Sequence, residues 1–366
     1  MDLISWIAYA DDYMEHIPEV DVVGHSQFNA TELLNYIRTT DVFVIATHGS
    51  PTSIRAVDGD CNISQLGRDT IMSLPTNALA DLDIAFLGAC ETGKTTTGNN
   101  MVEAFYAKGA RCVIGYTDTV VGDCHAAMAK YFCRALAMEY SVREALAFAD
   151  TRVAEDFPLN VGRTDQRYIL GNTNIIIQCY PEERSITPRN AANGAGDIVL
   201  LSNENGTYGF FDPSKLSTEN SAATPVTEDT AIERLNTYCQ NGQEYVLSDF
   251  KYTSDTDTYM AYFTNPINGI QTSDCVIITL NAAGEVAAYS RPRAGAFDGV
   301  DVTEQMVQQA EDAMYTIYSL SPGSTTIESR CIVWDEDVLS VRFFVKTLEP
   351  NASTGSTLDC YTIPLA

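Results

Sequence analysis

The stretch Asp83-Ile-Ala-Phe-Leu87 is a short apolar run that ends directly at Gly88-Ala-Cys-Glu-Thr-Gly93. An earlier apolar run, Asp41-Val-Phe-Val-Ile-Ala-Thr47, ends in the same way at His48-Gly49-Ser50. Continuous apolar runs of this length, closed by turn residues, are typical of strands in a parallel sheet that is covered on both faces. The two runs therefore predict neighbouring strands of an α/β domain, in which helices flank a mostly parallel sheet.

Further strands and helices alternate around these two runs. Two of the helices begin with a capping box, Asn29 with Glu32 and Ser141 with Glu144. The other predicted strands cover residues 3–9, 21–25, 111–116 and 168–172 with 175–178. The predicted helices cover residues 29–37, 100–108, 125–138 and 141–149. Alternation of this kind supports the α/β class.

The composition changes after residue 182, and the polar, glycine-containing stretch 189–196 indicates a domain boundary. We expect domains at 1–188 and 197–366. The second contains a helix followed by three strands, twice, in repeats at about 222–295 and 299–366. Its predicted helices begin at the Val-Thr-Glu triplets 226–228 and 302–304, and the predicted strands are 244–252, 258–264, 274–280, 325–334, 338–346 and 358–363. This pattern predicts an α+β accessory domain.

Composition excludes several classes of function. The 366 residues carry a formal net charge of −27, which repels phosphate backbones, so no nucleic-acid partner is expected. No apolar stretch approaches the roughly 18 residues that a membrane-spanning helix needs. The ten cysteines contain no Cys-x-x-Cys pair, so no metal site is expected. The only histidines are His16, His25, His48 and His125.

His48 and Cys90 both follow the carboxyl end of a predicted parallel strand, which is where functional residues gather in such sheets. A cysteine nucleophile attacks as a thiolate and needs a proton acceptor and an oxyanion hole. His48 would carry the proton. The backbone N–H groups of Gly49 and Cys90 would form the oxyanion hole, because glycine allows a close approach of the substrate.

These residues resemble those of a known family. Thr47-His48-Gly49 followed by Leu87-Gly-Ala-Cys-Glu-Thr-Gly93 is similar to the CHAT group of caspase-like cysteine peptidases, which belongs to clan CD with caspases, gingipains and separase. The resemblance covers roughly residues 1–180. It continues through the segments 104–115, 132–136 and 141–146.

The resemblance implies that His48 is the catalytic base and Cys90 the nucleophile. No cofactor is implied, although some relatives are activated by calcium. Relatives that cleave after Arg or Lys often carry an aspartate two residues before the cysteine, where this chain has Gly88. We expect Asp118 and Asp123 near the substrate pocket instead. Gingipain-like members often carry Gly-Asp-Pro where this chain has Leu170-Gly-Asn172, which is a second departure.

Two functions remain open from the sequence. The first is a cysteine endopeptidase that acts on protein or peptide substrates, with the C-terminal half binding or regulating. That half contains no histidine and resembles tandem PepSY-type modules in its element order. The alternative is a catalytically silent caspase-like scaffold or interaction module. His125, at a predicted helix start, is expected to be exposed or capping.

The sequence does not decide between a cytoplasmic and an extracytoplasmic location. Met1 leads almost directly into the apolar run 3–9 without a basic region, so no signal peptide is predicted. The run reads as the inside of a core strand, which indicates a trimmed chain. In that case the low lysine content and the PepSY-like repeat favour an extracytoplasmic protein. Oligomeric state is left open.

Overall fold

The computed structural model describes residues 27–157, 163–177, 198–203, 206–216, 226–239, 242–348 and 356–365. The chain divides into two units, residues 1–150 with 162–188 and residues 151–161 with 189–366. The predicted strands 3–9 and 21–25 and the predicted linker 189–196 lie outside the described residues. None of the described helices is long and apolar enough to cross a membrane.

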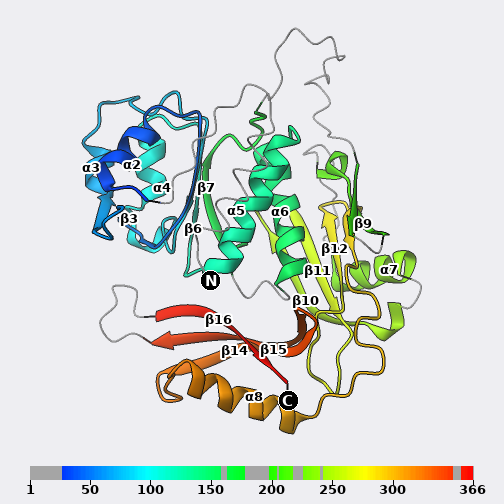
Figure 1. The fold of residues 1–366 in the computed structure, drawn as a ribbon. Coiled ribbons are helices and arrows are strands. Elements are labelled where there is room, and N and C mark those ends of the chain that lie inside the picture. Colours follow the sequence, from blue (N-terminus) through cyan, green and yellow to red (C-terminus); the bar gives the residue numbers. More distant parts are fainter. Residues whose placement is uncertain are drawn as a thin grey trace. The chain divides into compact units, whose positions relative to one another are not determined.

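The first unit is built on a four-stranded sheet in the order β1-β5-β6-β7 (Figure 1). Strands β1, β5 and β6 are parallel, and β7 runs antiparallel to β6. The strands are β1 (Val42–Ala46), β5 (Ile84–Gly88), β6 (Cys112–Tyr116) and β7 (Arg167–Gly171). Every residue of β5 and β6 is buried, as the continuous apolar runs predicted. The mostly parallel sheet is therefore confirmed, although Ile176 forms only an isolated bridge with Ser141 in place of a strand.

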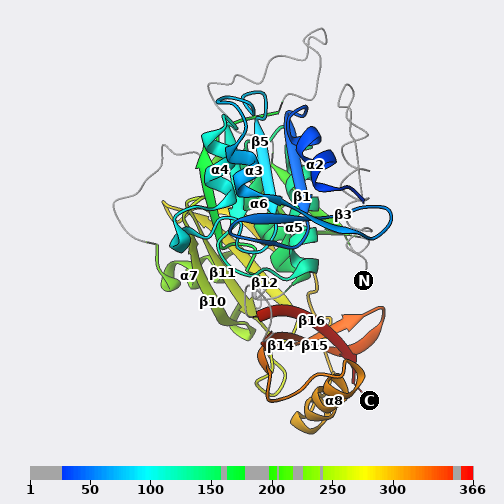
Figure 2. The same cartoon turned by 90° about the vertical axis from the view of Figure 1, so that its left-hand side faces the viewer.

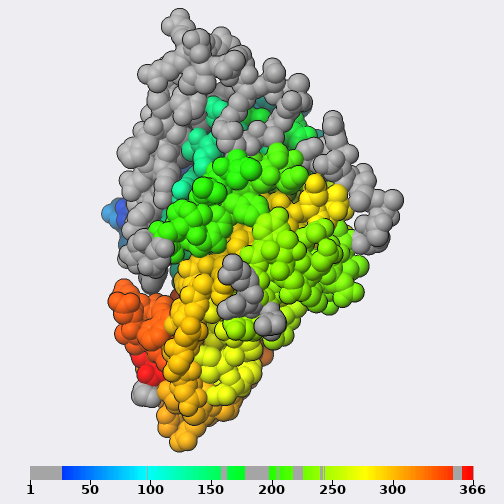
Figure 3. Space-filling view, turned by 90° about the vertical axis from the view of Figure 1, so that its right-hand side faces the viewer, coloured from blue at the N-terminus to red at the C-terminus, as the bar shows by residue number. Residues whose placement is uncertain are grey.

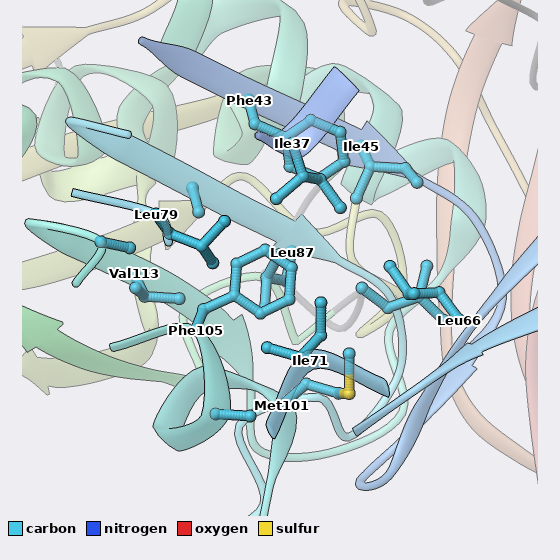
Figure 4. Close-up of a cluster of buried hydrophobic side chains, with 14 of the residues drawn as sticks. Ile37, Phe43, Ile45, Leu66, Ile71, Leu79, Leu87, Met101, Phe105 and Val113 are labelled. Atoms are coloured by element: carbon cyan, nitrogen blue, oxygen red, sulfur yellow. The ribbon is translucent and has the colours of Figure 1, made fainter. Parts of the chain in front are cut away.

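Helices cover both faces of this sheet. They are α2 (Ala30–Ile37), α3 (Arg68–Met72), α4 (Met101–Ala107), α5 (Gly122–Ala137) and α6 (Val142–Asp156), with a 3₁₀ turn η1 at Thr95–Thr97. Asn29 and Glu32 form the predicted capping box of α2, and Ser141 and Glu144 hydrogen-bond reciprocally before α6. Leu87 and Phe105 belong to the core between the sheet and α2, α3 and α4 (Figure 4).

Side chains alternate across β5, so Ala85 and Leu87 join that core while Phe86 and Gly88 face the opposite side. On that side Phe86 contacts Phe132 of α5 edge-to-face, with ring centroids 5.2 Å apart. Gly88 therefore lies on the face of the sheet that α5 covers.

A small antiparallel sheet follows β1 directly. It consists of β2 (Gly49–Ser50), β3 (Ser53–Val57) and β4 (Ile63–Gly67). The sequence pattern at residues 49–67 does not predict it. Ile54 and Leu66 pair in its register and are buried, which anchors the hairpin to the core.

The second unit contains two antiparallel sheets (Figure 2), and its surface is drawn in Figure 3. The larger has the order β10-β11-β12-β13-β9-β8, and the smaller has the order β14-β15-β16. Helices α7 (Glu228–Tyr238) and α8 (Glu304–Ile317) each precede a meander. The strands are β8 (Val199–Asn203), β9 (Gly206–Phe211), β10 (Val246–Thr253), β11 (Thr258–Thr264), β12 (Cys275–Asn281), β13 (Val286–Ser290), β14 (Thr325–Asp335), β15 (Val338–Leu348) and β16 (Ser356–Pro364), with 3₁₀ turns η3 (Pro213–Leu216) and η5 (Gly242–Glu244). The repeated helix-plus-three-strand pattern is confirmed, and the first copy carries the extra strand β13.

The division between the units falls within α6, after Asp150. Ala154 packs in one cluster with Tyr262, Cys275 and Ile277 of the second unit. The Ser290 hydroxyl donates a 2.6 Å hydrogen bond to Glu155. Residues 151–157 therefore complete the core of the second unit, whereas the sequence groups them with the first domain. The boundaries 1–188 and 197–366 stay predictions.

Candidate active site

Register places the two candidate catalytic residues at the same edge of the sheet. Ala46 of β1 pairs with Gly88 of β5, and the Thr47 N–H donates to the Gly88 carbonyl at 3.0 Å. His48 and Cys90 each stand two residues beyond the last pair. Because the strands are parallel, both residues leave the sheet at its carboxyl edge, where sites of such sheets form.

The turn after His48 needs glycine. A β-carbon on Gly49 would lie 2.6 Å from the Cβ of Ala89 and 3.3 Å from Thr92 Cγ2. The Arg55 N–H donates to the His48 carbonyl at 2.9 Å, and Gly49 is paired with Ile54. Hydrogen-bonded and non-bonded pairs alternate in an antiparallel ladder, so the Gly49 N–H points away from β3. That amide therefore takes no part in the ladder between β2 and β3.

The turn around Cys90 is held by its neighbours. The Thr92 hydroxyl donates to the carbonyl oxygens of Leu87 and Ala89, at 2.9 and 3.0 Å. Gly93 packs so tightly that a β-carbon there would lie 2.7 Å from the Gly115 carbonyl oxygen. These contacts explain why Thr and Gly follow Cys90 and Glu91. The Cys90 N–H donates to no backbone carbonyl within the described part of the chain.

The Cys90 thiol is half-buried, and its Sγ lies 3.8 Å from the Val120 carbonyl oxygen. Burial raises the pKa of Cys90, and the negative charges of Glu91 and Asp118 raise it further. Glu91 has a left-handed backbone (φ 60°), is buried, and forms an ion pair with Lys94. The resting thiol is therefore protonated, and its attack requires a base.

His48 is exposed, and its imidazole has no hydrogen-bond partner among the residues that the structure describes. No described side chain acts as a third member that orients it.

The two carboxylates expected near the pocket differ in their surroundings. Asp118 accepts a hydrogen bond from the Thr119 N–H at 2.7 Å and forms an ion pair with Arg163 at 2.5 Å. The Glu91 N–H donates to the Asp118 carbonyl at 3.2 Å, which ties this loop to the Cys90 turn. Asp123 lies in the first turn of α5, is half-buried, and has no ion-pair partner within the described ranges. Sequence reasoning missed Arg163, because nothing local links it to Asp118.

The position of His125 differs from the exposed or capping position that the sequence predicts. It is 2% exposed inside α5 and belongs to neither the surface nor the cap. A β-carbon on Gly88 would lie 1.9 Å from His125 Cε1 and 2.3 Å from the Ile45 carbonyl oxygen. The imidazole therefore fills the position where a side chain at residue 88 would stand. An aspartate cannot be placed there without displacing His125, which extends the departure from Arg- and Lys-specific relatives.

Metal ligands do not converge on this edge. In the ranges described above, no three His, Cys, Asp or Glu side chains come together in a way that could hold a metal ion.

Three comparisons relate the chain to known proteins. Residues 14–185 match the model of the CHAT domain family. A search of curated proteins finds no match. Among solved structures, the Arg-specific cysteine proteinase gingipain R is similar at 11% identity and a TM-score of 0.40, covering 57% of this chain and 53% of that one. The Bacillus megaterium YpeB C-terminal domain is similar at 10% identity and a TM-score of 0.23, covering 46% of this chain and 89% of that one.

Both TM-scores lie below 0.5, so the assignment rests on the family match together with the strand order and the two turns. Residues 14–185, just under half of this chain, are therefore similar to the CHAT domain family.

Proposed function

We propose that the protein is a cysteine endopeptidase that hydrolyses peptide bonds with a His48/Cys90 dyad. The observation that carries the proposal is the parallel pairing of Ala46 with Gly88, because it sets both residues two positions beyond the same edge of the sheet. The CHAT domain assignment supports the reaction class.

The mechanism begins with a neutral thiol, since the pKa of Cys90 is raised by burial and by nearby carboxylates. His48 accepts the thiol proton as Sγ attacks the scissile carbonyl carbon. The carbonyl electron pair moves to oxygen, and the Gly49 and Cys90 amides donate hydrogen bonds to this oxyanion. Its collapse breaks the C–N bond, and His48 donates its proton to the leaving amine. Water then hydrolyses the thioester, with His48 again as base.

Asp118 and Asp123 line the substrate pocket in this proposal. Arg163 neutralises Asp118, and residue 88 offers no carboxylate, so Asp123 is left as the carboxylate without a paired cation in the described structure. A single half-buried carboxylate attracts a basic side chain only modestly. We therefore propose a broad or weakly basic preference before the cleaved bond.

The second unit binds or regulates in this proposal. The chain beyond residue 188 contains no histidine, so it offers no base for a dyad of its own. The unit cannot be removed cleanly for a test, because residues 151–157 of α6 complete its core.

The test uses the full chain, a peptide library and a labelled electrophilic peptide probe. The proposal predicts peptide cleavage, together with labelling of the wild type that is lost in Cys90→Ala and in His48→Ala. Cys61→Ala is the matched control, because Cys61 is an exposed free cysteine, and it should label and cleave like the wild type. Equal labelling of all four proteins without cleavage would support the silent scaffold instead.

A further inference from the structure

The ring of His125 lies where the two strands that carry the dyad end. Its Cε1 and Nε2 would stand 1.9 and 2.1 Å from a β-carbon on Gly88, and the Ile45 carbonyl oxygen would stand 2.3 Å from the same point. Ile45 is three residues before His48, and Gly88 is two residues before Cys90. The ring thus fills the space that the absent side chain of Gly88 leaves open, next to the Ile45 carbonyl of the neighbouring strand.

The ring is also held from its other side. His125 Nδ1 lies 2.8 Å from the Tyr116 hydroxyl, and the Phe86 and Tyr116 rings meet it edge-on, with centroids 5.8 and 5.2 Å away. Tyr116 is fully buried, and burial raises its pKa well above the usual range, so the phenol keeps its proton. Burial lowers the pKa of His125 to about 4, so the imidazole is neutral near neutral pH.

The groups that face the His125 ring indicate which of its two nitrogens carries the proton. The Ile45 carbonyl can only accept a hydrogen bond, so the nitrogen that faces it, Nε2, carries the proton. Nδ1 then accepts from the Tyr116 hydroxyl. Nε2 lies beside Ile45 without a hydrogen bond of good geometry and has no other partner in the described structure. A small movement of the strand end would complete this bond, and a buried donor left unpaired is costly.

From this geometry we propose that His125 is a positioning residue of the dyad. It packs against the ends of both β1 and β5 and so supports the positions of His48 and Cys90, without contacting the substrate or the thiol. The inference rests on the proposed function and adds to it a buried residue that positions the dyad without taking part in the reaction. An apolar side chain of the same volume would fill the space but could not accept the hydrogen bond from Tyr116.

The test compares His125→Phe, which keeps an aromatic ring without nitrogens, with His125→Gln, which keeps an amide donor near the Nε2 position. Phe132→Leu is the matched control, because Phe132 is buried on the same helix and packs on Phe86 without reaching the strand ends. Two readouts are taken on the full chain. One is kcat and KM for a peptide substrate, and the other is the pH dependence of the iodoacetamide rate at Cys90, followed on the Cys90 peptide by mass spectrometry.

The expected result is a roughly tenfold or greater fall in kcat for His125→Phe with little change in KM, since misplaced reacting groups cost rate. The alkylation profile should move to higher pH because a displaced His48 is a poorer acceptor for the thiol proton, and His125→Gln should recover part of both effects. Phe132→Leu should lower the melting temperature without moving the alkylation profile. A wild-type profile in His125→Phe, or one moved equally by Phe132→Leu, would overturn the proposal. Absence of peptide cleavage by the wild type would instead count against the proposed function, because alkylation needs no peptidase activity.

Discussion

Gly49 and Ala89 lie in direct contact across the edge of the sheet, so that a β-carbon on Gly49 would stand 2.6 Å from the Cβ of Ala89. The contact joins the turn that carries His48 to the turn that carries Cys90. Neither turn would make this contact by itself, because the contact depends on the pairing of β1 with β5.

Substitution of Gly49 by Ala should therefore separate the two turns. Overpacking of this kind costs about 1–3 kcal/mol of stability, and we expect a loss of roughly tenfold or more in kcat/KM because the dyad and the amide at residue 49 move together. Peptide hydrolysis and thermal unfolding measure the two effects. Gly59→Ala is the control, because its β-carbon would meet only the flexible end of Gln27 at 3.3 Å. Equal activity of the two variants would contradict the role given to Gly49.

The charge of Asp118 should be visible in the reactivity of Cys90. Burial is the largest cause of the raised pKa of the Cys90 thiol, and the negative charge of Asp118 raises that pKa further. Asp118→Asn removes a negative charge and abolishes the ion pair between Asp118 and Arg163. Both changes favour the thiolate, so the pH profile of Cys90 alkylation should move to lower pH. Asp123→Asn should move the profile less, because Asp123 is not among the main causes of the raised Cys90 pKa, whereas Asp118 is. A shift to higher pH in Asp118→Asn would contradict this reasoning.

Much of the fold could be predicted because its signals are local. The apolar runs at residues 41–47 and 83–87 became β1 and β5, and the capping box at Asn29 begins α2 as expected. Helix α5 begins at Gly122, three residues before its predicted start at His125. The β2–β4 meander escaped prediction because its strands are short and mix buried with polar positions.

The parts of the site that escaped prediction depend on long-range packing. His125 reads as a helix-start residue in the sequence, and only the missing side chain of Gly88 makes room to bury it. Arg163 and Asp118 pair across 45 residues of sequence. Residues 151–157 continue the helical pattern of α6 without any local sign that they pack with β11 and β12.

The buried His125 should make the protein acid-sensitive. Its folded pKa of about 4 lies below the ordinary 6.5, so the unfolded chain binds the proton first as the pH falls. Stability is therefore lost between pH 6.5 and pH 4, by roughly 3 kcal/mol from this group. Urea unfolding across this range should show the loss in the wild type and a flatter dependence in His125→Phe. An equal slope in both proteins would place the acid sensitivity elsewhere.

In the second unit, Glu155 should make the folded state less stable as the pH rises, which is the opposite of the effect of His125. Burial raises its pKa to about 7, against the effects of the Arg152 charge and of the hydrogen bond from Ser290. A carboxyl whose folded pKa is raised gives its full stabilisation below the ordinary 4.5, and this is lost as the pH rises through about 7. The loss is on the order of 1–3 kcal/mol.

Hydrogen exchange of the amides at residues 151–157, corrected for intrinsic rates, should therefore show weaker protection at pH 8 than at pH 5. Glu155→Gln keeps an acceptor for Ser290 but does not titrate, so protection should become independent of pH over this range. Glu233→Gln is the control, because Glu233 is an exposed carboxylate of the same unit and should leave the wild-type dependence intact. If Glu155→Gln retained that dependence, the titrating group that loosens the end of α6 would not be Glu155. If protection instead increased with pH, the ion pair with Arg152 would outweigh the burial of the charge.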